Sequence, residues 1–282
     1  MERPIVLSCF QVEQALKARR DGLARVQISP DLGLSMVAVT LDADGIRFPQ
    51  GTFLPWRELE WIMASPQSCF VVEDGSVRKI QAFSEETNRF YSLMPTEWAP
   101  TLLVSGVPMH RIKDTDPHAD TLEKIKTISP VVGRVLDTAT GLGYTAIEAA
   151  RTAEQVITIE LDPTVLEIAR LNPWSQELFE NPKIVQLIGD SFEEVQKFEE
   201  ASFTRIIHDP PMFSLAGDLY SEAFYRELFR VLAPGGRLFH YVGDLESRSG
   251  RNVVRGVARR LQAAGFRRVV RRPRAFGVVA YK

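Results

Sequence analysis

Five short apolar segments between residues 134 and 242 constrain the fold more than any other feature of the sequence. They read RVLDT, VITIEL, KIVQLIG, FTRIIHD and GRLFHYV, and they are rich in β-branched residues. Strands that are apolar almost throughout must be covered on both faces. Segments with a helical apolar stripe separate them, namely YTAIEAARTA, PTVLEIARLN, SFEEVQKF and LYSEAFYRELFRVLA. This alternation predicts an α/β domain with a Rossmann-like, doubly wound, mostly parallel sheet.

The remaining segments complete the expected organisation. NVVRGVARRLQAAGF predicts a further helix, while RRVVRRP and FGVVAYK predict a closing strand pair that brings the sheet to seven strands. Before residue 106 the pattern differs: FQVEQALKARR predicts a helix capped by Ser8 and Gln11, and short strand-like segments follow, with a tight turn at Asp74-Gly75. We therefore expect a small N-terminal domain of one helix and antiparallel β-strands at residues 1–105, and the α/β domain at residues 106–282.

Composition and the chain start restrict the cellular setting. No apolar run approaches the roughly 18 residues that a membrane helix needs, so no membrane partner is expected. The start, MERPIVLSCFQVEQ, has no signal-peptide pattern, which predicts a cytoplasmic protein. Cys9 and Cys69 form no CxxC pair and the four histidines show no ligand spacing, so neither a disulfide nor a metal site is expected. The sequence leaves a homo-oligomer open.

Charge is strongly segregated along the chain. Between Arg251 and Lys282 there are ten basic and no acidic residues, although the formal net charge of the whole chain is −2. Such a segment is either a solvated surface or a footprint for a polyanion. The second interpretation makes RNA the partner to test, bound through residues 251–282.

The turn after the first predicted strand, LDTATGLGYTA, indicates a nucleotide-type ligand. Gly141 and Gly143 allow a sharp turn and close approach of a ligand, and with Ala146 they match the loose dinucleotide pattern. Glu160 ends the next strand, where a carboxylate accepts hydrogen bonds from ribose hydroxyls of NAD or of an adenosyl cofactor. Asp137 distinguishes the two, because an acid opposes a pyrophosphate but attracts a cationic amino acid and sulfonium.

The third predicted strand ends in LIGD. Asp190 is placed there to accept a hydrogen bond from an adenine amino group, and Ser191 lies beside it. A second interpretation is that Asp190 is only the N-cap of the next helix.

Together these segments resemble a known family. VLDTATGLGYTAIEAA, VITIELDP, IVQLIGDSFEEV, IIHDPPMF and FRVLAPGGRLFHYVG, in this order, resemble the motifs of class I S-adenosylmethionine-dependent methyltransferases. The chain from about residue 106 onward is similar to a mostly archaeal family of predicted methyltransferases with a DPP motif. The resemblance implies S-adenosylmethionine as cofactor, held by Asp137, Thr138, Ala139, Gly141, Gly143, Tyr144, Glu160, Leu161, Gly189, Asp190 and Ser191. Ala139 departs from the glycine that many members have there.

The HDPPMF segment predicts the catalytic residues. The resemblance implies that Asp209 ends the fourth strand beside the reactive methyl, and Pro210 and Pro211 fix the backbone that follows. A carboxylate and a backbone carbonyl there accept the N–H bonds of an amine and turn its lone pair toward the methyl. Amino-group methyltransferases often have an aromatic residue next; here Phe213 comes one position later. A strand stop with a solvated acid is the alternative.

Three other functions remain open. LYSEAFYRELFRVLAPGG also resembles spermidine synthases, which would make the chain an aminopropyltransferase using decarboxylated S-adenosylmethionine, with Asp209, Asp218 and Glu222 as acids of a polyamine pocket. The arginine-rich end of the chain opposes this. An NAD-linked oxidoreductase is disfavoured by Asp137, and an RNA-binding subunit without turnover by the DPP motif.

Overall fold

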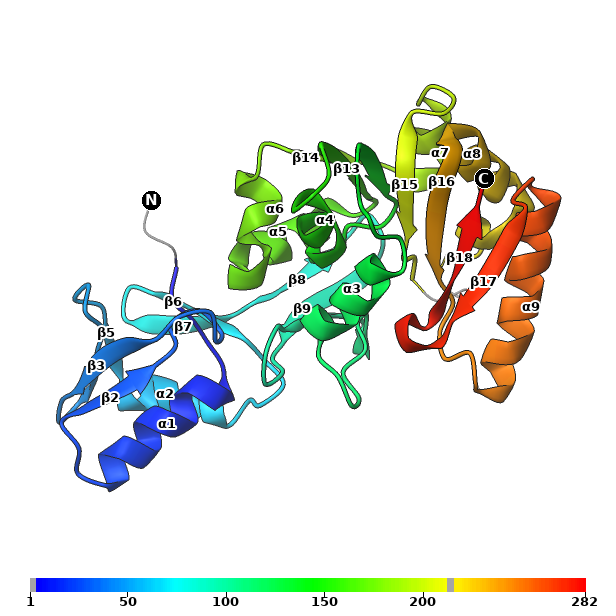
Figure 1. Ribbon diagram of the computed structural model, residues 1–282. Helices are drawn as coiled ribbons and strands as arrows, with labels where there is room; N and C mark the ends of the chain where they lie inside the picture. The colour runs from blue at the N-terminus through cyan, green and yellow to red at the C-terminus, as the bar shows by residue number, and fades with distance from the viewer. Residues whose placement is uncertain (1–3, 212–215) are drawn as a thin grey trace. The chain divides into compact units, whose positions relative to one another are not determined.

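The computed structural model describes residues 4–211 and 216–282 (Figure 1). Phe213, one of the predicted catalytic residues, therefore lies outside the described residues. The chain forms two compact units, residues up to 118 with 164–176, and residues 119–163 with 177–282. Each is described by itself. The domain boundary at 105/106 stays a prediction.

The second unit is built on a seven-stranded sheet. In chain order its strands are β12 (Arg134–Asp137), β13 (Gln155–Glu160), β14 (Ile184–Ile188), β15 (Phe203–His208), β16 (Leu232–Tyr241), β17 (Arg268–Arg272) and β18 (Gly277–Tyr281). Their spatial order is β14-β13-β12-β15-β16-β18-β17. Neighbours are parallel except that β18 is antiparallel to both β16 and β17. The predicted seven-stranded, mostly parallel, doubly wound sheet is confirmed.

The strand order sets where a ligand can enter. From β12 the chain moves outward to β13 and β14, and from β15 it moves the opposite way to β16. In doubly wound sheets of this order, right-handed crossovers place the connecting helices on opposite faces, and the ligand crevice lies at the carboxyl ends of the strands at the switch point, here β12 and β15. From residue 117 onward the helices are α3 (Pro117–Lys126), α4 (Tyr144–Ala150), α5 (Pro163–Leu171), α6 (Gln176–Glu180), α7 (Ser191–Gln196), α8 (Glu222–Val231) and α9 (Arg248–Ala263), with 3-10 turns at Pro173–Ser175, Gly217–Tyr220 and Pro273–Ala275. Of these, α5 from residue 164 and the Pro173–Ser175 turn belong to the first unit.

Helices α8 and α9 share a hydrophobic core with the strands of this sheet. Phe224 and Leu228 of α8 and Val257 and Leu261 of α9 pack with Ile206 and other buried residues of the strands. Apolar side chains at i, i+3 or i+4 form the buried face of each helix, as the sequence pattern predicts. This packing fixes β15, and with it the residues that follow its carboxyl end.

The first unit is rich in antiparallel β-structure. Its helix α1 (Cys9–Arg20) starts at the predicted capping box, in which the Ser8 side chain accepts from the Phe10 N–H and the Gln11 side chain accepts from the Ser8 N–H. Its strands are β1 (Val6–Leu7), β2 (Arg25–Ile28), β3 (Val37–Leu41), β4 (Gly45–Arg47), β5 (Phe53–Pro55), β6 (Phe70–Glu73), β7 (Ser76–Lys79), β8 (Gln81–Ser84), β9 (Arg89–Met94), β10 (Thr101–Val104) and β11 (Val107–Pro108). They form three antiparallel sheets.

Two local features of this unit can be compared directly with the sequence predictions. Asp74 and Gly75 have φ of 48° and 77°, which is the positive-φ pair that a tight hairpin turn requires, as predicted. The sequence analysis missed helix α2 (Trp56–Met63), which follows Pro55 and buries Leu59 and Ile62. At eight residues it is too short for its apolar stripe to stand out from the neighbouring strand patterns.

Candidate functional site

Four acidic residues gather at the carboxyl edge of the sheet. Asp137 ends β12, Glu160 ends β13, Asp190 follows β14 and Asp209 follows β15. In the sheet register Asp137 pairs with Ile207, two residues before Asp209. Since parallel strands end at the same edge, these side chains share the crevice at the switch point.

Asp137 is the most deeply placed of the four. Its side chain is fully buried, and Oδ2 accepts hydrogen bonds from the hydroxyls of Thr145 at 3.0 Å and Thr158 at 3.1 Å. Burial raises its pKa to about 7, although these hydrogen bonds favour the charged form. In the described part of the chain, Oδ1 is buried and has no hydrogen-bond partner. A buried acceptor without a donor is costly, so this oxygen fits a ligand that brings an N–H group.

The glycine turn, residues 141–143, follows shortly after Asp137 in the chain. Gly141 and Gly143 have φ of 53° and 79°, a conformation that other residues rarely adopt. A Cβ on Gly143 would lie 2.7 Å from the Leu178 side chain, whereas a Cβ on Gly141 would meet no described atom within 4 Å. Gly143 is thus needed for packing, and Gly141 leaves open space beside the turn.

Glu160 holds this turn in place. Its Oε2 accepts from the Gly141 N–H at 2.8 Å, and its Oε1 accepts from the Asp162 N–H at 3.2 Å. Burial nevertheless raises the pKa of Glu160 to about 7. A carboxylate has about four lone-pair sites, so Glu160 can still accept hydrogen bonds from two hydroxyls. Leu161 beside it is 48% exposed and offers an apolar surface.

Other predicted cofactor residues tie the loops of the crevice together. The Thr138 hydroxyl lies 2.7 Å from Nδ1 of His208, and the Ser191 hydroxyl donates to the Thr138 carbonyl at 2.6 Å. Asp190 is exposed and caps α7, with Oδ1 accepting from the Phe192 N–H at 2.6 Å. The capping interpretation of Asp190 therefore holds, and its Oδ2 is still available to a ligand.

The three remaining predicted positions are small or buried. Ala139 is half-buried in the loop after β12, and Tyr144 is buried at the start of α4. Gly189 lies where a Cβ would come within 2.6 Å of the Glu194 side chain. These positions shape the crevice walls.

A lysine that the sequence analysis did not single out binds Asp209. Nζ of Lys124 donates to Oδ2 of Asp209 at 2.6 Å and lies 2.9 Å from Oδ2 of Asp120, its i−4 neighbour on α3. The side chains of Lys124, Asp120 and Asp209 are 3%, 0% and 19% exposed. Nζ also lies 4.7 Å from the centre of the Tyr241 ring. The three charged side chains form a nearly buried triad, Asp120–Lys124–Asp209.

The triad keeps its lysine charged. Burial opposes the ammonium of Lys124, but the charges of Asp209 and Asp120 outweigh it and raise its pKa. Burial raises the pKa of Asp209, and Lys124 counteracts this. One cation between two carboxylates leaves the triad with a net negative charge when all three are ionised.

A local signal for α3 exists in the sequence. Asp116 accepts from the His118 N–H at 2.9 Å, and Pro117 is the first helical residue, which is a typical helix start. The spacing of Asp120 and Lys124 is that of an i,i+4 ion pair. The contact with Asp209, 85 residues away in the chain, has no such local signal.

His208 is a structural residue. It is fully buried, and Nε2 lies 2.9 Å from the Leu219 carbonyl. Because a carbonyl only accepts, Nε2 carries the proton and Nδ1 accepts from the Thr138 hydroxyl. Burial lowers the pKa of His208 to about 3, so the ring stays neutral. Both ring nitrogens are used, which supports a core histidine rather than a proton relay.

The two prolines continue from Asp209 as predicted. Pro210 is buried, and the Pro211 carbonyl accepts from the Tyr220 hydroxyl at 3.1 Å. Tyr220 thereby links the end of β15 to the turn before α8. The Tyr220 hydroxyl therefore anchors the backbone at Pro211.

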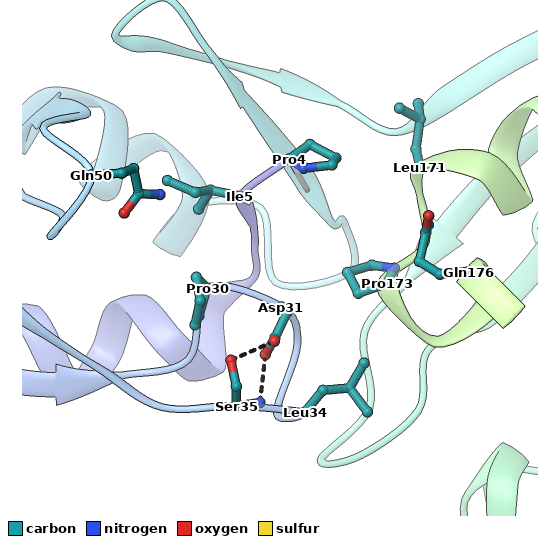
Figure 2. Close-up of a pocket in the computed structure, with 10 residues that line it drawn as sticks. All are labelled: Pro4, Ile5, Pro30, Asp31, Leu34, Ser35, Gln50, Leu171, Pro173 and Gln176. Carbon is teal, nitrogen blue, oxygen red and sulfur yellow. Dashed lines mark hydrogen bonds between the residues drawn. The ribbon is translucent and has the colours of Figure 1, made fainter. Parts of the chain in front are cut away.

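A pocket of about 290 Å³ lies in the first unit (Figure 2). Prolines and aliphatic side chains line most of it, with Asp31 as its acid. The Asp31 carboxylate accepts from the Ser35 N–H at 2.8 Å and from the Ser35 hydroxyl at 2.5 Å. This acid is used to shape its own loop, and the pocket offers no reactive group comparable with the crevice.

The described residues contain neither a metal-ligand cluster nor a membrane-spanning helix. Within 4–211 and 216–282, no three His, Cys, Asp or Glu side chains are grouped so as to hold a metal ion. No helix in the same ranges has the length and apolar character needed to cross a bilayer.

Comparison with known proteins agrees with the geometry of the crevice. Residues 135–236 match the family described as "Methyltransferase domain". Over 238 residues the chain is 46% identical to "Uncharacterized protein MJ1233" of Methanocaldococcus jannaschii, covering 84% of this chain and 81% of that protein. No activity is attached to that archaeal protein, so membership of an archaeal family with a DPP motif stays a prediction.

Other similar proteins are named as aminopropyltransferases rather than methyltransferases. The chain is 32% identical over 133 residues to "Polyamine aminopropyltransferase 2" of Streptomyces coelicolor, covering 43% of this chain and 24% of that enzyme. A spermidine synthase crystallised with the transition-state analogue AdoDATO shares the fold, with a TM-score of 0.59, 19% identity and 71% of each chain covered. The chain spans only about a quarter of the length of the Streptomyces enzyme. By its extended identity with MJ1233, the chain belongs to the same family as that protein; its residues 135–236 match a methyltransferase domain and lie in a Rossmann-like fold.

Proposed function

We propose that this protein transfers the methyl group of S-adenosylmethionine to an amino nitrogen of RNA. The observation that carries the proposal is the pairing of an orphaned buried acceptor on Asp137 with the lysine-bound carboxylate of Asp209 at one crevice. The first fits the cationic methionine part of the cofactor, and the second fits the amine that receives the methyl. The methyltransferase family match over residues 135–236 supports the reaction type.

The cofactor would be held by the edge residues already described. Oδ1 of Asp137 accepts from the amino group of its methionine part, and Glu160 accepts from its ribose hydroxyls. Oδ2 of Asp190 accepts from the adenine amino group, with Leu161 against the ring. Bound there, S-adenosylmethionine supplies an electrophilic methyl group on sulfur.

Asp209 orients the acceptor. Lys124 occupies Oδ2, which leaves Oδ1 to accept an N–H of the substrate. This fixes the nitrogen lone pair in line with the methyl. Such positioning can lower the activation barrier by several kcal/mol, and complete pre-orientation of two reactants lowers it by ~7–11 kcal/mol. The N–C bond would form as the S–C bond breaks with its electron pair left on sulfur, and the nitrogen held by Asp209 would then release a proton to solvent.

Lys124 also bears on which amine is accepted. Its ammonium lies 2.6 Å from the carboxylate that would otherwise attract a cation. Because the triad as a whole keeps one negative charge, Lys124 weakens its attraction for a cationic polyamine without reversing it, whereas the neutral exocyclic amine of a nucleobase needs no such attraction. Pro210 and Pro211 are proposed to hold the backbone beside that base.

An aminopropyl transfer is the second candidate, favoured by the similarity to aminopropyltransferases and to the spermidine synthase fold. Of its proposed acids, Glu222 is paired with Arg226 at 2.6 Å on the surface of α8. That pair leaves Asp218 as the exposed acid to test.

One experiment separates the two reactions. Single-turnover assays would offer S-adenosylmethionine with an RNA extract, and decarboxylated S-adenosylmethionine with putrescine. We expect methylated RNA in the first mixture and no spermidine in the second. Spermidine formation without RNA methylation would replace the proposal by the second candidate.

A further inference from the structure

A basic groove lies on the second unit, outside the acidic crevice. It has a volume of about 670 Å³ and is bounded by α9, β17 and β18. Arg251 and Arg255 of α9 and Arg271 of β17 line it. Its apolar lining includes Val254, Val269 and Val278.

Sheet register gives the position of this groove along the strands. Arg271 pairs with Val278, which pairs with His240, which pairs with His208. His208 immediately precedes Asp209, so the groove lies near the same carboxyl edge as the reaction site. β17 is three strands from β15, which at about 4.8 Å per strand is about 14 Å.

The three arginines are not neutralised by the protein. Within the described ranges, no carboxylate lies within ion-pairing distance of Arg251, Arg255 or Arg271. Arg271 donates to the Leu245 carbonyl at 3.0 Å and Arg255 to the Asn252 side chain at 2.5 Å. These contacts orient the guanidinium groups and leave further N–H donors on each. Three such groups around an apolar floor favour an extended polyanion with ribose-like apolar surface.

We propose that this groove binds the phosphate backbone of the RNA acceptor and so positions the target base at Asp209. The inference rests on the proposed function for the identity of the acceptor. Arg251, Arg255 and Arg271 contact phosphate oxygens, while the half-buried Val269 offers an apolar contact to a sugar. Phosphate contacts of this kind set register rather than sequence preference.

The test compares two double variants with the same loss of charge. Arg251→Gln/Arg255→Gln removes the helical arginines of the groove. Arg267→Gln/Arg268→Gln is the matched control, because both arginines are exposed and lie at the opposite end of β17. Affinity for a labelled 20-nucleotide single-stranded RNA would be measured between 50 and 200 mM salt, with DNA of the same sequence as competitor.

The groove variant is expected to reduce the slope of log affinity against log salt by about 1.4, since each lost contact on a single strand is worth about 0.7. The control should keep the wild-type slope. Equal slopes for wild type and groove variant, equal losses in both variants, tighter binding of DNA, or no RNA binding by the wild type would each overturn the proposal.

Two further assays distinguish failure of the proposed methyl transfer from failure of the proposed groove. Titration calorimetry of each variant with S-adenosylmethionine reports the cofactor site, and methyl transfer to RNA reports the reaction. A groove variant that binds RNA like the wild type while wild-type protein still methylates RNA would refute the groove alone. RNA binding that depends on the groove without any methyl transfer would refute the reaction alone.

Discussion

Replacing Asp137 by Asn should stabilise the protein while removing its cofactor affinity. Burial raises the pKa of Asp137 from 3.8 to about 7. The folded state therefore retains a proton that the unfolded state releases between these two values, so the free energy of unfolding falls as the pH rises through that window. At about 1.4 kcal/mol per pKa unit, the cost of this carboxylate is about 4 kcal/mol at pH 8 and about 2 kcal/mol at pH 5.

An asparagine removes this cost but adds a smaller one. Its oxygen can accept from Thr145 and Thr158, while its amide N–H₂ takes the position of Oδ1, where no described group accepts. That costs about 1–3 kcal/mol. The net gain at pH 8 is about 1–3 kcal/mol, or about 2–6 °C in Tm for a chain of this size.

Differential scanning fluorimetry without ligand at pH 5 and pH 8 measures this. We expect Asp137→Asn to melt above the wild type at pH 8 and not at pH 5. At pH 8, S-adenosylmethionine should raise the Tm of the wild type only. A variant that is less stable than the wild type at pH 8, or a difference that does not change with pH, would refute the reasoning.

Further predictions concern the triad and the glycine turn. Lys124→Met leaves two nearly buried carboxylates without their cation and should lower the free energy of unfolding by about 3–5 kcal/mol in urea titrations. Adding Asp120→Asn should restore part of this stability. An unchanged urea midpoint for Lys124→Met would contradict the role of the triad. Affinity for S-adenosylmethionine should rise by about tenfold from pH 6 to pH 8, because the Asp137 carboxyl, with a pKa of about 7, must ionise to hold a cation; calorimetry that finds no change would count against that contact. Gly143→Ala forces a Cβ against Leu178 at positive φ and should lower the free energy of unfolding by at least about 1 kcal/mol. Thermal melting measures this loss, with Ala139→Gly as a nearby control.

Sequence alone gave the sheet and its edge because both depend on local patterns. β15 is an apolar run ended by Asp209-Pro210, and a run of that kind is legible without knowledge of its neighbours. The predicted parallel order then brings Asp137 and Asp209 to one edge. The capping role of Asp190 was also visible as one of two local alternatives.

The missing parts depend on contacts between distant segments. Lys124 acquires its role only when α3 packs beside the end of β15, 85 residues later in the chain. The hydrogen bond from the Gly141 N–H to Glu160 forms only because the turn folds back over β13. The basic segment was evident as composition, but the groove exists only because α9 packs beside β17 and β18.

The most direct test of the central claim uses methyl-labelled S-adenosylmethionine with a total cell extract, followed by separation of RNA, protein and small molecules. Wild-type protein should label RNA, Asp209→Asn should bind the cofactor but leave RNA unlabelled, and Asp218→Asn, nine residues farther along and exposed, should label RNA like the wild type. Digestion of the RNA should then yield a base methylated on nitrogen. Label in RNA that is unchanged by Asp209→Asn, or label confined to protein or small molecules, would contradict the account.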